Sequence, residues 1–161
     1  MEETSVPYVV FLPKSRKRNV LRALFGSSIS LDIVRFSVEG GIPSKILQKD
    51  LIENLGHSNK SIINHLNILT EVGILEEHME KTISSGRTVW LKSYTFTDLG
   101  KWFAFLLVEE EKLSREEKIE ILGSAFRSYI RWVRKLSGHL GMQTEELSRI
   151  FEEEMEETSG A

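Results

Sequence analysis

The spacing of apolar residues changes at Gly73, and this change is the strongest constraint on how the chain can fold. Upstream, apolar residues recur every three or four positions in three segments that each end at a glycine, which predicts three consecutive helices. The segments cover residues 28–41, 42–56 and 57–73, and residues 45–47 are also compatible with a short strand. Downstream, residues 74–97 are rich in Thr, Ile, Val, Trp, Tyr and Phe around the sequence SSGR. This composition predicts two strands joined by a glycine turn.

Three helices followed by a hairpin is the element order of a winged helix-turn-helix. From Thr97 the helical spacing returns, with Ser114 and Glu117 forming a capping box before a long helix. We therefore expect a mainly α fold with a small β-hairpin wing and a C-terminal helical extension. The expected divisions are an N-terminal segment at 1–27, a winged helix-turn-helix domain at 28–103, and a C-terminal helical region with an acidic tail at 104–161.

The composition is that of an ordinary globular protein without disulfides. Of the 161 residues, 40% are hydrophobic and 28% are charged, and the absence of Cys excludes thiol catalysis and thiolate metal ligands. The longest apolar runs are too short to cross a bilayer, and the N-terminus lacks the layout of a signal peptide. These features predict a cytoplasmic protein that does not associate with membranes.

The charge is distributed unevenly along the chain. The formal net charge is −3, which by itself argues against binding to nucleic acid. Residues 12–95, however, contain twelve basic and eight acidic side chains, whereas residues 96–161 contain nine basic and fourteen acidic ones. The first part is therefore the one that is suited to a polyanionic partner.

The third predicted helix has an unusual polar face. Its polar residues are Asn59, Lys60, Ser61, Asn64, His65 and Asn67, most of which are poor helix formers. Short polar side chains suit base edges in the major groove, because Asn pairs with adenine, Lys with guanine and Ser with either. Taken alone, the helix is explained about equally well by a solvated face in which Ser58 and Asn59 are caps.

The surrounding residues resemble the recognition-helix region of the ArsR and MarR-like winged-helix superfamily. The matching positions are Ser58, Ser61, Ile62, His65, Leu66, Leu69, Gly73, Ile74 and Leu75. Upstream, KDLIENLG is similar to a helix of that family, and downstream SSGRTVW and YTFTDLG are similar to the wing and the following segment of archaeal members. The resemblance covers residues 28–103.

This resemblance implies a regulator of transcription that binds specific double-stranded DNA sequences as a homodimer. The recognition helix at 58–71 would enter the major groove, and the wing at 80–92 would contact the backbone or the minor groove. Arg87 matches the wing arginine of the family, which meets phosphate or the minor groove, and Lys81 and Lys92 flank it. An exposed surface arginine is the alternative for Arg87. His65 matches a family histidine near the DNA, and packing against the second helix is the alternative for this residue.

The chain departs from the metal-sensing members of the family. It has no Cys, and its four His residues show no ligand spacing, so we expect no metal site and no cofactor. The sequence does not indicate whether a small-molecule effector binds. The basic segment at 14–18 is compatible with an arm on the DNA backbone and equally with a solvated linker.

The long helix predicted after Ser114 carries a short heptad seam. Its members are Ile119, Leu122, Phe126, Tyr129, Val133 and Leu136, which are three or four residues apart. Two recognition helices one DNA turn apart require a two-fold partner, so we expect the seam to mediate dimerisation. Packing of the helix on the winged domain of its own chain is the alternative.

Two other classes of function compete with DNA binding. Winged helices also serve as protein-interaction modules in transcription or repair assemblies, and the acidic C-terminal part is compatible with that role. We do not expect an enzyme, because the sequence FGSS is not followed by the paired aspartates of a nucleotidyltransferase and no phosphate-binding loop is present. Most aromatic residues are predicted to be core, namely Phe25, Phe36, Trp90, Phe96, Trp102, Phe103 and Phe105.

Overall fold

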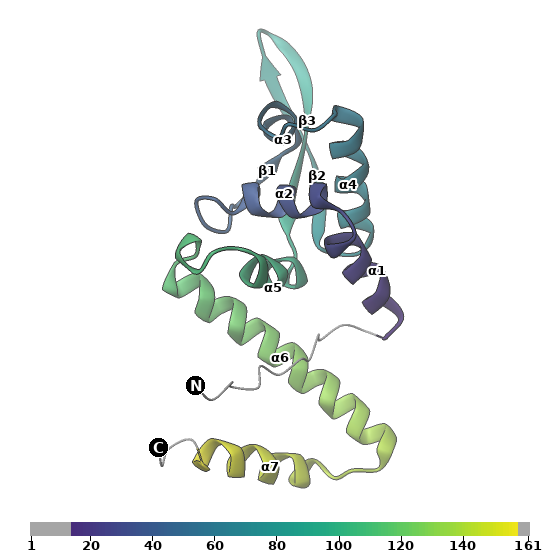
Figure 1. Cartoon of the computed structure of the whole chain (residues 1–161), viewed down its shortest axis with the longest axis vertical. Coiled ribbons are helices and arrows are strands. Elements are labelled where there is room, and N and C mark those ends of the chain that lie inside the picture. The colour runs from purple at the N-terminus through teal and green to yellow at the C-terminus, as the bar shows by residue number, and fades with distance from the viewer. Residues whose placement is uncertain (1–13, 158–161) are drawn as a thin grey trace. The chain divides into compact units, whose positions relative to one another are not determined.

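The computed structural model describes residues 14–157 and shows a mainly helical chain with one small antiparallel sheet (Figure 1). The elements in order are α1 (Lys14–Phe25), α2 (Ser28–Ser37), β1 (Ile46–Leu47), α3 (Gln48–Asn54), α4 (Asn59–Glu71), β2 (Leu75–Ser84), β3 (Arg87–Phe96), α5 (Asp98–Leu107), the 3-10 helix η1 (Glu110–Lys112), α6 (Arg115–Leu140) and α7 (Thr144–Glu157). The expected helix-rich fold with a hairpin is confirmed. The chain divides into two compact units, which we call unit 1 (1–125) and unit 2 (126–161).

The core of unit 1 is built from the apolar faces of α1 to α5 and from the base of the sheet. Its fully buried side chains include Val20, Leu24, Ile33, Val34, Leu51, Ile62, Leu66, Leu69, Ile74 and Tyr94. In α4 the buried residues are three or four positions apart, as expected for a helix with one face on a core. The core therefore fixes which face of α4 meets solvent.

The expected N-terminal boundary is wrong. Val20 and Leu24 of α1 are fully buried in the same core as α2 and α4, so α1, the described part of this segment, belongs to unit 1, and residues 1–13 lie outside the described residues. The basic segment at 14–18 lies at the start of α1, and its side chains lie outside the described residues. Sequence analysis did not predict this helix, because no local pattern of residues indicates that α1 packs on distant elements.

The expected C-terminal boundary also differs from the structure. Unit 1 continues through α5 and the first turns of α6 to Ala125, with Phe103 and Ala104 of α5 buried in its core. The capping box predicted at the start of α6 is confirmed. The backbone N–H of Ser114 donates to Glu117 Oε2 at 2.7 Å, and the Glu117 N–H donates to Ser114 Oγ at 3.2 Å.

The sheet has the strand order β1-β3-β2, and all its pairs are antiparallel. The hairpin runs from the pair Leu75 and Phe96 at its base to the pair Ser84 and Arg87 at its tip. Ser85 (φ 51°) and Gly86 (φ 74°) form the two-residue turn, and positive φ at both positions is typical of the type I′ turn that suits hairpin twist. Both the predicted hairpin and the short strand near residues 45–47 are present.

Polar contacts attach the base of the hairpin to β1 and α3. The buried Tyr94 hydroxyl donates to Gln48 Oε1 at 3.1 Å, and burial, with the charge and hydrogen bonding of Glu77, raises the pKa of Tyr94 to about 12. Two ion pairs lie beside this contact, Lys45 with Glu80 at 2.7 Å and Lys92 with Glu77 at 2.8 Å. The base of the hairpin is thus held by several charged and buried groups, while its tip extends beyond them.

Unit 2 consists of the C-terminal half of α6 and all of α7 within the described residues. The rings of Phe126 and Phe151 meet with centroids 6.0 Å apart, and an apolar cavity of about 510 Å³ lies between the two helices. Many of the larger apolar side chains of unit 2 are about half exposed or more, including Ile130, Trp132, Leu136, Leu140, Ile150 and Met155. No helix in the described part of the chain is long and apolar enough to cross a membrane.

Candidate nucleic-acid interface

Helix α4 begins with a side-chain cap that leaves its N-terminal turn open to solvent. Ser58 Oγ accepts the backbone N–H of Ser61 at 3.2 Å, and the Ser58 hydroxyl donates to Ser61 Oγ at 2.8 Å. The first turn contains no acidic residue, and Lys60 lies within it. The positive end of the helix dipole and the Lys60 ammonium therefore act together to attract an anion.

The polar face that the sequence predicted for α4 lies opposite the core. Ile62, Leu66 and Leu69 are fully buried. Asn59, Lys60, Asn64 and Asn67 are exposed, whereas Ser61 and His65 are half-buried at the edge of this face. The exposed side chains present amide donors, amide acceptors and one ammonium to solvent, which is the chemistry that reads base edges.

His65 has a structural contact of its own. Its Nδ1 lies 2.8 Å from the carbonyl oxygen of Ser61, which can only accept, so Nδ1 carries the proton in the neutral ring. Its Nε2 lies 2.8 Å from Oγ of Ser27, the residue that caps α2. These contacts hold His65 against the start of α2, the first of the three expected helices, and not against the second one, which was the expected alternative to a DNA contact.

The hairpin carries the other basic residues of the candidate interface. Lys81 lies opposite Trp90 in the strand register, and Arg87 is the first residue after the turn. Both Lys81 and Arg87 are exposed. A two-stranded ribbon with basic residues at its tip can follow a DNA groove or a phosphate backbone.

Some basic residues of unit 1 are paired with acids, whereas others, such as Lys60, Lys81, Arg87 and also Arg22 and Arg35, form no ion pair among the described side chains. Lys45, Lys92 and Lys101 each form an ion pair with a glutamate, at 2.7, 2.8 and 3.4 Å. Among residues 19–157, where side chains are described, Lys60, Lys81 and Arg87 form no ion pair within 4.0 Å. Their charges therefore remain available to an external anion.

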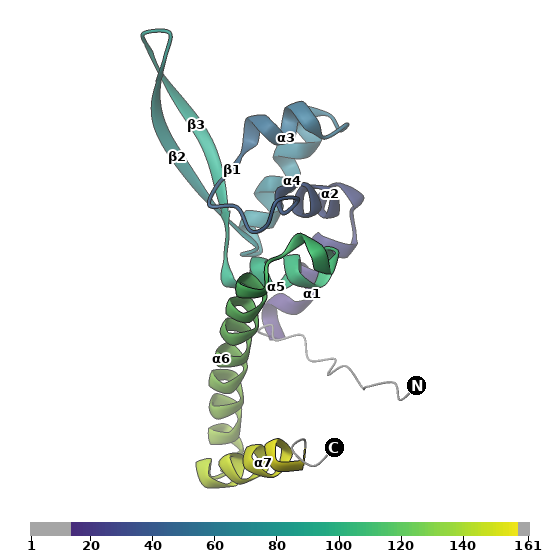
Figure 2. The same ribbon diagram turned by 90° about the vertical axis from the view of Figure 1, so that its left-hand side faces the viewer.

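The two basic elements lie at the same end of unit 1. Figures 1 and 2 show the turn between α3 and α4 and the outer half of the hairpin both directed toward the upper end of this unit. Helix α4 ends near the base of the hairpin, because only three residues separate Glu71 from Leu75. The N-terminal turns of α4 and the hairpin tip can thus be presented to one elongated partner.

Sequence reasoning missed an exposed apolar group on the hairpin. Trp90 is 60% exposed, so its prediction as a core residue is wrong, and Met79 and Ile83 are exposed with it. Phe25, at the end of α1, is also exposed, contrary to prediction. The strand register places Trp90 opposite the exposed Lys81, and alternation along the strands was the signal that could have indicated this position. The sequence does not show, however, how far the body of unit 1 covers the hairpin.

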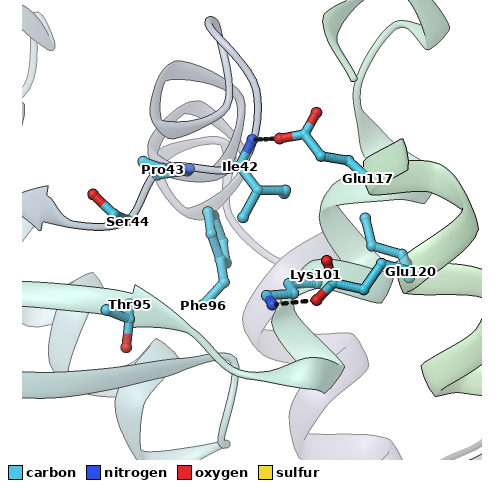
Figure 3. Close-up of a pocket in the computed structure, with 9 residues that line it drawn as sticks. Ile42, Pro43, Ser44, Thr95, Phe96, Lys101, Glu117 and Glu120 are labelled. Atoms are coloured by element: carbon cyan, nitrogen blue, oxygen red, sulfur yellow. Dashed lines mark hydrogen bonds and ion pairs between the residues drawn. The ribbon is translucent and has the colours of Figure 1, made fainter. Parts of the chain in front are cut away.

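A cavity of about 480 Å³ lies between the loop at 42–44, the end of β3 and the start of α6 (Figure 3). Figure 3 shows Glu117 turned to the backbone of Ile42, whose N–H donates to Glu117 Oε1 at 2.7 Å, and Lys101 directed at Glu120. Burial raises the pKa of Glu117, but the N–H groups of Ser114 and Ile42 and the Ser114 hydroxyl outweigh it, and the net pKa is lowered. The polar groups of this cavity thus hold the start of α6 against the loop at 42–44 and against α5.

The described residues contain no group of three or more His, Asp or Glu side chains that could hold a metal ion. His57 and Asp32 form a pair at 2.8 Å, which joins the turn before α4 to α2. Two ligands from the protein are fewer than a structural metal site uses.

The seam predicted for dimerisation is divided between the two units. Ile119 and Leu122 are exposed in unit 1, and Leu136 is exposed in unit 2. Phe126, Tyr129 and Val133 line the apolar cavity of unit 2 together with residues of α7. The middle of the seam thus lies against α7 of the same chain, whereas its ends are exposed, and dimerisation through the seam stays a prediction.

Comparisons with known proteins give no family for the chain: no family model matches its sequence, and no curated protein does so.

Proposed function

We propose that this protein is a winged helix-turn-helix regulator of transcription, of the type that the ArsR and MarR-like superfamily represents, and that it binds specific double-stranded DNA sequences. One observation carries the proposal. The start of α4, with its exposed Asn and Lys face, lies at the same end of unit 1 as the outer half of the hairpin (Figure 1). That part of the hairpin carries Lys81 and Arg87, and Lys60, Lys81 and Arg87 form no ion pair among the described side chains.

In this proposal α4 enters the major groove and the hairpin lies on the adjacent backbone or minor groove. Asn64 and Asn67 offer a donor and an acceptor to adenine edges, and Lys60 offers a donor to guanine acceptors or to phosphate. Arg87 and Lys81 supply contacts that are independent of sequence and that strengthen all binding. His65 acts mainly by holding α4 against α2.

We further propose that the protein acts as a homodimer through unit 2. A unit of 36 residues with two helices is too small to bury its own apolar side chains, and many of them are about half exposed here. The charges also suit a second copy, because α7 contains seven Glu and one Arg whereas α6 is basic between residues 127 and 135. Two copies would supply the two recognition helices of a palindromic site.

A second candidate function is that of a protein-interaction module in a transcription or repair assembly. The observation that favours it is the exposure of Met79, Ile83 and Trp90 on the hairpin, since apolar patches commonly mark protein contacts. The basic residues on the same strands favour DNA over this alternative.

Selection of bound duplexes from a random pool, followed by affinity measurements at several salt concentrations, tests the proposal. We expect a recurring sequence and a linear fall of log K with log salt, with a slope near −0.9 for each phosphate contact. Weak binding without sequence preference or salt dependence would contradict DNA regulation and favour the protein-interaction module.

A further inference from the structure

One face of the hairpin carries exposed apolar side chains together with the exposed Lys81. The strand register places Met79, Lys81, Ile83, Thr88, Trp90 and Lys92 on one side, which we call the tryptophan face. On it, Ile83 is 77% exposed, Trp90 60% and Met79 53%. Ile83 is the most exposed large apolar residue among the described side chains, and it lies two positions before the turn. Such exposure of three neighbouring apolar residues calls for a partner that covers them.

The outer part of the hairpin is complementary to a polyanion. Residues 81–97 contain no Asp or Glu and three basic residues. Of these, Lys92 is paired with Glu77 at 2.8 Å, whereas Lys81 and Arg87 form no ion pair among the described side chains. The acid before this stretch, Glu80, is paired with Lys45 at 2.7 Å. A partner of this face must therefore cover apolar side chains and also accept the positive charge of Lys81, and a nucleic acid does both.

The tip of the hairpin is also narrow. Its residues at positions 84–88 are two Ser, Gly, Arg and Thr, so small side chains surround the turn, and Figure 2 shows the tip extending beyond the helices of unit 1. A narrow basic tip can enter the minor groove, where apolar side chains of other DNA-binding proteins insert between base pairs and kink the duplex.

We propose that the hairpin enters the minor groove of duplex DNA and inserts Ile83 between two base pairs, with Trp90 packed beside it and Lys81 on the adjacent phosphate. The duplex is thereby unstacked at one step and bent. This inference rests on the proposed function, which it extends from recognition of DNA to its deformation. The protein then prefers a base-pair step that unstacks easily, such as TA, at a position where it forms no hydrogen bond to the bases.

The test uses the full chain and a selected duplex of about 30 base pairs that carries a fluorophore at each end. Energy transfer between the ends reports bending, and anisotropy reports affinity. We expect the wild-type protein to bend the duplex, and Ile83→Ser to remove most of the bend and weaken binding about tenfold. Val89→Ser is the matched control, because Val89 is exposed on the opposite face of the same strand pair, and it should change neither measurement.

A second measurement needs no variant. A mismatched pair placed at the kinked step lowers the cost of unstacking, so the wild-type protein should bind the mismatched duplex about tenfold more tightly than the matched one. Binding without a bend and without a preference for the mismatch would overturn the insertion and leave the proposed function intact. No binding to any duplex would overturn both. A lower mass of free Ile83→Ser in solution would assign the tryptophan face to self-association and would also overturn the insertion.

Discussion

Ser27 Oγ lies 2.8 Å from Nε2 of His65, across 38 positions of sequence, and thereby joins the cap of α2 to the middle of α4. Ser27 also accepts the backbone N–H of Ile29 at 3.2 Å, and His65 donates through Nδ1 to the Ser61 carbonyl. These hydrogen bonds form a continuous chain from the start of one helix to the next. His65, a residue of α4, therefore helps to hold the candidate recognition helix in its orientation on α2.

The first prediction follows from this chain of hydrogen bonds. His65→Ala should lower the free energy of unfolding by about 1–3 kcal/mol, because it leaves the part-buried Ser27 hydroxyl without its partner. Urea denaturation measures the change. The effect on DNA binding should be similar for all sequences, since α4 would be less well held. A stable His65→Ala variant with altered base preference would instead make His65 a residue that reads DNA.

The second prediction concerns Arg87 at the hairpin tip. Arg87→Ala should weaken binding to all duplexes about equally and reduce the slope of log K against log salt by about one unit, because one phosphate contact is lost. Lys118→Ala is the control, since Lys118 lies on α6 with Glu110 at 3.6 Å and should leave the slope unchanged. Equal slopes for Arg87→Ala and the wild type would place the hairpin away from the DNA.

The third prediction is a dependence of stability on pH through Glu117. Its pKa in the folded protein is lowered below the ordinary value of 4.5, so the charged form stabilises the fold above that pH, and this contribution is lost as the pH falls through the lowered pKa. Glu117→Gln should cost about 1–2 kcal/mol at pH 7 and progressively less as the solution becomes acidic. Thermal unfolding at a series of pH values gives the comparison.

Glu116→Gln provides the control for this measurement. Glu116 occupies the same first turn of α6 and is exposed, so its substitution removes the same charge from the helix terminus. We expect it to have a much smaller effect that varies little with pH. If stability depended on pH identically in Glu116→Gln and Glu117→Gln, the stabilisation would come from the helix dipole and not from the hydrogen bond with Ile42.

The fourth prediction is that unit 2 holds the homodimer together. Ile130→Glu combined with Ile150→Glu places charges on two half-exposed residues that line the apolar cavity, and light scattering should then give the mass of a monomer. Ser128→Glu adds a charge at an exposed polar position of the same helix and should leave the dimer intact. A wild-type protein that is monomeric at all concentrations would contradict the dimer.

The features that were predictable from the sequence are those encoded by neighbouring residues. Ser58 caps α4, the box of Ser114 and Glu117 starts α6, and the hairpin turns at Ser85 and Gly86, each through contacts over two or three positions. The face of α4 also followed from spacing, because three buried apolar residues fix a helix on its core.

The features that were missed depend on contacts between distant residues. Val20 and Leu24 are core only because α1 packs on α2 and α4, and no local pattern required that contact. Trp90 has the composition of a core residue, yet it lies beyond the part of the hairpin that the body of unit 1 covers. Alternation along a strand gives the face of a residue, whereas burial depends on which element lies over that face.

The last prediction tests the exposed face of α4 through Asn64. If Asn64 meets a base edge, Asn64→Ala should cost about 1–3 kcal/mol of binding on the selected site and relax the preference at one or two base pairs. The same change should leave thermal stability equal or slightly raised, because Asn64 is exposed and Ala is the better helix former. His65→Ala is the matched variant one position along, and it should show the opposite result, with lower stability and unchanged base preference. Loss of stability in Asn64→Ala with intact selectivity would show that the face of α4 assigned to the major groove does not read DNA.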